Sequence, residues 1–307
     1  MKIKGFIDLH THGINGYDTK TTNPEHILKM AQLHGRAGTA AILPTIYSAP
    51  IDEMRKNMEA VRRAIEVQKS NPPLPPFAKG GRGGINHSSL ITRHSSLILG
   101  VHLEGPFLNP VRCGALDKDS FIKPTISSLK NLIEGYEDII KIITIAPEIP
   151  GALKIIERCN EHGIRVNMGH SDSTYKQALD AKKAGATGIT HLFNAMRPFH
   201  HREPGLIGLG LMDEDIYIEV IADKVHINET VLKLIFTTKR SDRVILISDS
   251  VKGAKNKKGH IYPKRGVLAG SLITLFDTAK NLKNLGISET IVKKAAIDNP
   301  RRYLNVK

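Results

Sequence analysis

The sequence has few of the residues that build disulfide frameworks, membrane spans or base-stacking surfaces. Its 307 residues include 2 cysteines, no tryptophan and 5% aromatic residues. Cys113 and Cys159 cannot form a disulfide framework, and their spacing fits no cysteine-based zinc site. The chain has no run of about 18 apolar residues, and its N-terminus lacks the apolar core of a signal peptide. We therefore expect a cytoplasmic protein with no membrane partner.

Acidic residues are also scarce. Lys and Arg number 44 against 30 Asp and Glu, which gives a net charge of +14. The basic residues are dispersed, and so few aromatic residues accompany them that we expect no nucleic acid partner. With 40% hydrophobic and 24% charged residues, the composition is that of a globular protein and excludes a collagen-like fibre, a coiled coil or a disordered chain.

Short, nearly continuous apolar runs alternate with amphipathic stretches along the chain. Such runs are typical of parallel strands that are covered on both faces. We count eight, at residues 5–9, 40–45, 97–103, 139–146, 164–169, 187–192, 216–222 and 244–249. Helical patterns occupy residues 25–37, 51–69, 126–136, 151–162, 173–184, 228–238, 275–285 and 288–297. Eight β–α repeats predict an α/β fold, a (β/α)8 TIM barrel formed as a single domain by residues 1–307.

Residues 71–96 interrupt this alternation. The segment is first rich in Pro and Gly and then repeats the sequence HSSLI. It lies between a predicted helix and the third strand, which places it on the barrel face opposite the usual active site. We interpret it as a low-complexity insertion, and its His87 and His94 as bystanders.

Side chains that bind metals or transfer protons gather where the predicted strands end. They are His10, His12, His102, Glu104, His170, His191, Asp223, His226 and Asp249. The carboxyl ends of barrel strands are where catalytic groups converge, and imidazoles with carboxylates suit a divalent metal. A chain with 14 histidines produces pairs by chance, so the prediction rests on the whole set rather than on His10 and His12 alone.

Three of these positions carry a more specific expectation. Glu104 follows an apolar run at the barrel mouth, where an acid needs a partner, and it suits one metal ion or a bridge between two. His102, two residues earlier, fits a supporting role. Asp249 is the expected general base. After His170, either Asp172 or Ser173 is expected to cap the next helix.

The stretches that hold these residues resemble the N-acetylglucosamine-6-phosphate deacetylase family of the amidohydrolase superfamily. The matching stretches follow the family order, at residues 6–13, 100–110, 168–172, 190–208, 221–227, 246–250 and 266–271. The resemblance implies a metal-dependent barrel that hydrolyses the acetamide of N-acetylglucosamine 6-phosphate to glucosamine 6-phosphate and acetate, in amino-sugar catabolism. It also implies a homodimer.

The resemblance assigns a role to each matching residue. Glu104, His170 and His191 are implied metal ligands, and His10 and His12 match members that hold a second ion, with zinc or iron as the metal. Asp249 matches the catalytic acid and base. Arg202 matches the phosphate-binding arginine, and His226 the residue that polarises the acetamide carbonyl. The remaining implied substrate contacts are Ala115, Asn194, Ala195, Asp223, Leu268, Ala269 and Gly270.

Three departures from the family pattern keep other interpretations open. Leu116 stands where the family usually has a histidine, the 71–96 insertion is extra, and most of a β-sandwich built from both chain termini is expected to be absent. One alternative is therefore a truncated, inactive homologue that still binds metal. Another is a different amidohydrolase, such as a dihydroorotase-like enzyme, although those use a carboxylated lysine where this chain has Glu104.

Overall fold

Eight parallel strands follow one another around the central sheet, with the short β5 paired to β4 as a ninth, which confirms the predicted TIM barrel. The computed structural model describes residues 3, 5–72, 95–253 and 267–306. The strand order is β1-β4-β6-β7-β8-β9-β10-β11, each strand parallel to its neighbours. Their bounds are β1 Phe6–Thr11, β4 Thr39–Tyr47, β6 Val101–Glu104, β7 Ile140–Ile145, β8 Arg165–Met168, β9 Gly188–Ile189, β10 Tyr217–Ile221 and β11 Val244–Ile247.

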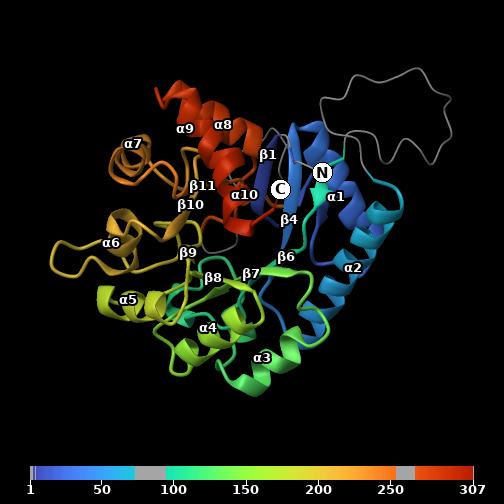
Figure 1. Cartoon of the computed structure of the whole chain (residues 1–307), viewed down its shortest axis with the longest axis horizontal. Coiled ribbons are helices and arrows are strands. Elements are labelled where there is room, and N and C mark those ends of the chain that lie inside the picture. The colour runs from blue at the N-terminus through green and yellow to red at the C-terminus, as the bar shows by residue number, and fades with distance from the viewer. Residues whose placement is uncertain (1–2, 4, 73–94, 254–266, 307) are drawn as a thin grey trace.

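The helices surround this sheet (Figure 1). Their bounds are α1 Pro24–Arg36, α2 Ile51–Ser70, α3 Ile126–Ile133, α4 Ala152–Glu161, α5 Tyr175–Lys183, α6 Gly205–Met212, α7 Glu229–Thr238, α8 Leu275–Asn284, α9 Glu289–Lys293 and α10 Asn299–Leu304. Thr125, Thr174 and Thr274 each begin a helix with a reciprocal capping box, which satisfies amide donors that the first turn leaves free. Thr174, rather than Asp172 or Ser173, caps α5, so that part of the sequence prediction is wrong.

The ends of the sheet meet at the carboxyl side of the strands. The Asp249 amide donates to the His10 carbonyl at 2.9 Å, and the His12 amide donates to the Ser250 carbonyl at 2.8 Å. Asp249 and Ser250 follow β11 directly, so this seam ties the last strand to the first. It also brings His10, His12 and Asp249 to one point, although Asp249 is distant from the histidines in sequence.

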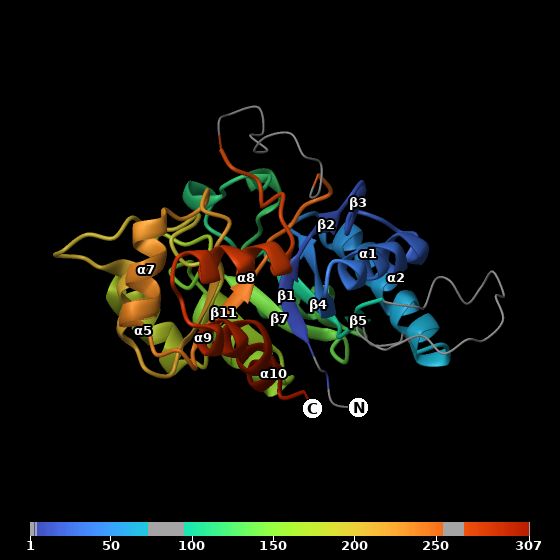
Figure 2. The ribbon, with the colours of Figure 1, turned by 90° about the horizontal axis from the view of Figure 1, so that it is seen from above.

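The amino side of the barrel is covered by the end of the chain. Tyr303 of α10 is buried and belongs to a core cluster with apolar residues of β1, β4, β7, β10 and β11. Arg301 donates to the Ile3 carbonyl at 2.7 Å, and the two termini lie side by side (Figure 2). The C-terminal helix therefore reaches the barrel interior from the side opposite the strand ends that carry the histidines.

The structure differs from the predicted elements in three places. The third predicted strand is divided into β5 Leu97–Ile98 and β6 at Gly100, whose φ of 143° suits only glycine. Residues 13–18 form a small antiparallel pair, β2 Gly13–Ile14 with β3 Tyr17–Asp18. The connection after His191 ends in α6, a helix that is not among the helical patterns predicted from the sequence. Most of the 71–96 insertion, with His87 and His94, lies outside the described residues.

Candidate active site

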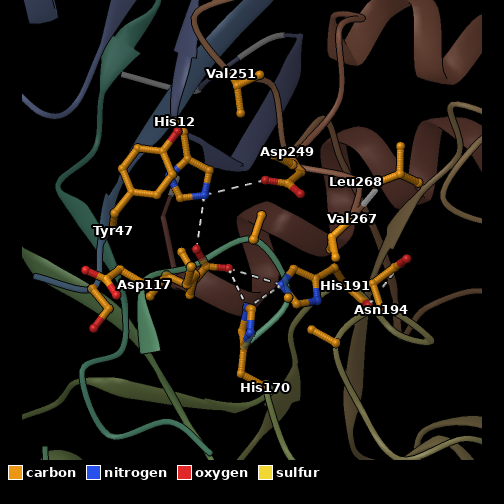
Figure 3. A pocket seen from close by; sticks show the side chains of 18 of the residues that line it. His12, Tyr47, Asp117, His170, His191, Asn194, Asp249, Val251, Val267 and Leu268 are labelled. Atoms are coloured by element: carbon orange, nitrogen blue, oxygen red, sulfur yellow. Dashed lines mark hydrogen bonds and ion pairs between the residues drawn. The ribbon is translucent and has the colours of Figure 1, made fainter. Parts of the chain in front are cut away.

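Glu104, His170 and His191 come from three different strand ends and meet at one point. The Glu104 Oε1 atom lies 3.1 Å from the Nε2 atom of His170 and 3.1 Å from that of His191. The two Nε2 atoms lie 3.2 Å from each other. Ligands at the corners of a zinc-sized tetrahedron are separated by roughly 3.3 Å. These three donor atoms therefore have the mutual spacing of ligands around one zinc-sized ion. Figure 3 shows His170 and His191 side by side at this point, joined by a dashed contact.

His10, His12 and Asp249 form a second group beside the first. The Nε2 atoms of His10 and His12 are 3.2 Å apart, and the Asp249 Oδ1 atom lies 3.6 Å and 3.5 Å from them. Glu104 faces both groups, because its second oxygen, Oε2, lies 3.2 Å from the His12 Nε2 atom. Oε1 also lies 3.6 Å from the His10 Nε2 atom, so Glu104 contacts both histidine groups, which suits either of the two roles expected for it, binding one metal ion or bridging two.

The hydrogen bonds of the imidazoles show why these groups fit a cation. The His12 Nδ1 atom contacts the Thr45 carbonyl at 3.0 Å, and the His170 Nδ1 atom contacts the Arg112 carbonyl at 3.0 Å. A carbonyl only accepts, so Nδ1 carries the proton in both rings and Nε2 presents a lone pair. Lone pairs facing one another and a carboxylate repel unless a positive charge lies among them. The donor set therefore fits a divalent metal ion.

The contacts of His102 fit the supporting role expected from its sequence position. Its Nδ1 atom donates to the Leu9 carbonyl at 3.1 Å, which leaves the Nε2 atom to accept from the Thr144 hydroxyl at 2.8 Å. Both ring nitrogens are thus occupied by protein groups. His102 lies against His10, with ring centroids 4.7 Å apart, and so buttresses that ring rather than offering a lone pair.

Burial shapes the protonation of the whole cluster. It lowers the pKa of His10 and of His191 below the usual imidazole value. Burial alone would raise the pKa of Glu104, but the surrounding histidines hold it well below its usual range. The pKa of Asp249 is raised well above its usual value by burial and by the charge of Glu104. Neutral imidazoles beside an ionised Glu104 are the state in which these groups bind metals.

Three of these residues adopt a backbone conformation that side chains rarely take. The φ angles are 47° at His170, 32° at His191 and 47° at Asp249. Positive φ in a residue other than glycine costs free energy and is concentrated at functional sites. Here each unusual turn follows a strand and directs the side chain over the barrel axis.

A pocket of about 470 Å³ opens above the histidines. Ligand pockets of this size accommodate a small metabolite. Among the predicted substrate contacts, those that line it are Ala115, Asn194, Ala195, His226, Leu268, Ala269 and Gly270. Leu116 also lines it, at the position where the resemblance expects a histidine. The Tyr47 ring stacks on His12 at 3.8 Å between centroids and forms part of the pocket wall.

His226 is held in the pocket wall by Asp223. The His226 Nδ1 atom donates to the Asp223 Oδ2 atom at 2.7 Å, while the other oxygen accepts the amides of Val225 and His226. Burial disfavours the charged imidazolium, but the hydrogen bond and charge of Asp223 outweigh it and raise the pKa of His226. Asp223 is not among the described residues that line the pocket. Its carboxylate therefore affects the pocket by orienting His226.

Arg202 lies apart from these groups. It occupies the exposed turn before α6, where its Nη1 atom contacts the His201 Nε2 atom at 3.0 Å. It is not among the residues that line the pocket. Its predicted role in phosphate binding therefore stays a prediction.

Sequence reasoning missed three acidic residues around the site, of which Asp8 and Glu219 are buried and Glu148 is partly buried. Asp8 accepts from the Ser248 hydroxyl at 2.5 Å and from its amide at 3.1 Å. Glu219 of β10 contacts the His10 Nδ1 atom at 3.4 Å, and Glu148 accepts from the Ser171 hydroxyl beside His170 at 2.7 Å. The available signal was an acid inside an apolar strand run, as in FIDL and YIEVI, because a buried acid needs partners.

A parallel barrel whose strand ends carry histidines and carboxylates around one pocket defines the amidohydrolase class of enzymes. Relatives and solved structures narrow this class. The chain is 32% identical to the N-acetylglucosamine-6-phosphate deacetylase of Bacillus subtilis, over 99% of this chain and 75% of that protein. It is 29% identical to an Escherichia coli N-acetylgalactosamine-6-phosphate deacetylase, over 98% of this chain and 77% of that protein. The chain belongs to the N-acetylglucosamine-6-phosphate deacetylase family.

Solved structures agree with this assignment. The Thermotoga maritima N-acetylglucosamine-6-phosphate deacetylase matches 99% of this chain and 78% of its own, with a TM-score of 0.83 and 27% identity. A mutant of the Mycobacterium smegmatis enzyme, solved in complex with N-acetyl-D-glucosamine-6-phosphate, matches with a TM-score of 0.84 and 25% identity. That match covers 99% of this chain and 78% of the other. No family model matches the chain.

Proposed function

We propose that this protein hydrolyses the acetamide of N-acetylglucosamine 6-phosphate and releases glucosamine 6-phosphate and acetate. The observation that carries the proposal is the convergence of Glu104, His170 and His191 beneath a pocket that Asp249 also lines. Membership in the deacetylase family supports the reaction type. A complete donor set also argues against an inactive homologue.

Glu104, His170 and His191 are the residues proposed to hold a first zinc or iron ion, and His10 and His12 a second, with Glu104 facing both groups. When bound, such an ion lowers the pKa of a water molecule and polarises a carbonyl group. The facing lone pairs of the histidines support this assignment, because they repel one another without a cation. We propose zinc or iron as the metal, bound as one ion or two.

Asp249 is the proposed acid and base. Its carboxylate lies at the pocket floor, 3.5 Å from the His12 Nε2 atom, on a turn of positive φ that fixes its direction. There it takes a proton from the attacking water and returns one to the departing amine nitrogen. His226, whose charged form Asp223 favours, directs its remaining ring nitrogen to the acetamide oxygen as negative charge develops there.

The sugar is proposed to lie between two loops of the pocket. Asn194 and Ala195 follow His191, and Leu268, Ala269 and Gly270 form a second segment of the pocket wall. Gly270 has a φ of 61°, and a Cβ atom there would lie 2.6 Å from the Asp249 carbonyl oxygen. The close approach of this segment to Asp249 therefore requires glycine.

An epimeric substrate is a second candidate, because one relative is named N-acetylgalactosamine-6-phosphate deacetylase. We expect faster acetate release from the glucosamine derivative than from the galactosamine derivative. Comparing kcat/KM for the two phosphorylated sugars tests this directly. The reverse order would assign the pocket to the galactosamine substrate.

Arg202 is proposed to bind the substrate phosphate, as the family resemblance implies. Arg202→Ala should raise KM for N-acetylglucosamine 6-phosphate and leave kcat/KM for unphosphorylated N-acetylglucosamine unchanged, because only the first substrate carries a dianion. Lys233→Ala, an exposed cation on α7, is the matched control. Equal losses on both substrates would show that Arg202 only supports its loop.

The proposed setting is the cytoplasm, with a homodimer as the working assembly. In the part of the chain that the structure describes, no helix combines the length and apolarity needed to cross a membrane. Cys113 and Cys159 are free. Both findings are consistent with this setting, which fractionation and light scattering would test.

A further inference from the structure

A line of buried polar side chains connects the C-terminal helix to the histidines. The Tyr303 hydroxyl donates to the Asn167 Oδ1 atom at 2.5 Å. The Asn167 Nδ2 atom donates to the Glu219 Oε1 atom at 3.0 Å. The other Glu219 oxygen lies 3.4 Å from the His10 Nδ1 atom. All four residues are at most 1% exposed, so solvent does not substitute for any of these contacts.

His10 differs from His12 and His170 in what orients it. His12 and His170 each donate Nδ1–H to a backbone carbonyl, which main-chain geometry holds in place. The corresponding partner of His10 is a side chain, the Glu219 carboxylate. A carboxylate at Nδ1 keeps the proton on that nitrogen and leaves the Nε2 lone pair toward His12. The direction of His10 therefore depends on where Glu219 is held.

Asn167 and Tyr303 determine how Glu219 is held. An asparagine amide presents either its oxygen or its nitrogen to a neighbour, and only the nitrogen attracts a carboxylate. Because the Tyr303 hydroxyl proton is directed to the Asn167 oxygen, the Asn167 nitrogen faces Glu219. The Thr187 hydroxyl then donates to the Tyr303 oxygen at 3.1 Å and completes the line. Without the tyrosine hydroxyl, the amide loses this fixed orientation.

We propose that Glu219 is a positioning residue for His10, and that Tyr303 acts on the site through Asn167 and Glu219. The inference rests on the proposed two-ion site, because His10 belongs to its second group. It assigns to α10 a part in metal binding from the opposite side of the barrel. Among the described residues, the side chains of Glu104, His170 and His191 form hydrogen bonds with one another and not with the carboxylate of Glu219, which contacts His10.

Zinc titration of the full-length protein, with affinities measured by competition with a chelator, tests this inference. We expect the wild type to bind two zinc ions. Glu219→Gln should lower the affinity for the second zinc ion by about 10- to 100-fold, the usual effect of losing a partner of a ligating histidine. The affinity for the first ion should not change. Tyr303→Phe, which keeps the buried ring, should lower the affinity for the second ion by a smaller factor. Glu214→Gln makes the same chemical change on the surface and serves as the control.

Each outcome of this experiment has a distinct meaning. If the wild type binds a single zinc ion, the two-ion proposal is wrong. If it binds two and both variants match it, Glu219 does not position His10. If Tyr303→Phe lowers the affinity for both ions equally, this series of hydrogen bonds only stabilises the fold, and the inference is overturned. Should Glu219→Gln fail to fold, the Tyr303→Phe result decides alone.

Discussion

At the scale of single residues, the role of each histidine depends on the hydrogen-bond partner of its second ring nitrogen, the one that faces away from the site. The carbonyl groups of Thr45 and Arg112 accept hydrogen bonds from the Nδ1 atoms of His12 and His170, which keeps the proton on Nδ1 and leaves Nε2 to face the cluster. His102 shows the opposite case, because both of its nitrogens are satisfied by protein groups. Residue type and strand-end position predicted the histidines, whereas the partner of each nitrogen is visible only in the folded chain.

His191 provides the first prediction at this scale. The buried Nδ1 atom of His191 has no hydrogen-bond partner among the described residues, while its Nε2 atom lies 3.1 Å from Glu104. His191→Ala removes one of three ligands, so purified protein should lose most of its bound metal in elemental analysis. His162→Ala, at the end of α4 and away from the pocket, is the control. Full metal content in His191→Ala would contradict the ligand assignment.

At the scale of elements, the apolar runs predicted each barrel strand, but turns and short helices were less visible. Helix α6 begins after Pro204 and contains Gly205, Gly208 and Gly210, a composition typical of loops. Its glycines are explained by packing, because a Cβ atom on Gly210 would lie 2.7 Å from the Leu192 side chain. That close approach is a tertiary contact, and no local pattern reports it.

The loop that carries His170 depends on Glu148, which lies beyond β7. Its carboxylate accepts from the Ser171 hydroxyl at 2.7 Å, the Asp172 amide at 2.6 Å and the Asn109 side chain at 2.8 Å. Glu148→Ala leaves these donors unsatisfied, which should lower the free energy of unfolding by about 1–3 kcal/mol. Denaturant unfolding measures this loss, and metal affinity should fall with it.

Glu157→Ala, on the exposed face of α4, is the matched control for Glu148. This control also removes a glutamate carboxylate, but one that lies away from the His170 loop. It should change neither stability nor metal binding. Equal behaviour of the two variants would show that the hydrogen bonds of Glu148 do not hold the His170 loop.

At the scale of the whole molecule, barrel closure brings together groups that are distant in sequence. Asp249 reaches His12 only because the segment after β11 pairs with β1. The repeat count predicted that closure, and the predicted ligands therefore met as expected. The buried supports Asp8, Glu219 and Tyr303 were not predicted, because their partners lie in other strands or in the last helix. The prediction about a terminal β-sandwich stays a prediction.

The predicted insertion allows a test of how much of the chain the site needs. We expect that replacing residues 73–94 with a short Gly/Ser linker leaves metal content and activity unchanged, because loop closure entropy varies only slowly with length. Ser95 and Ser96 must be kept, since the Ser96 hydroxyl donates to the Thr39 carbonyl at 2.7 Å. A linker that also replaces them should lower Tm. Loss of metal in the shorter replacement would contradict the interpretation of this segment as dispensable.

The central claim is that this pocket performs a metal-assisted deacetylation with Asp249 as its acid and base. Acetate release from N-acetylglucosamine 6-phosphate, measured for wild type and Asp249→Asn at matched metal content, tests it most directly. An amide has nearly the shape of the carboxylate but does not take up the proton of the attacking water, so the variant should lose at least about 100-fold in kcat. Comparable acetate release by Asp249→Asn, or none by the metal-loaded wild type, would contradict the account.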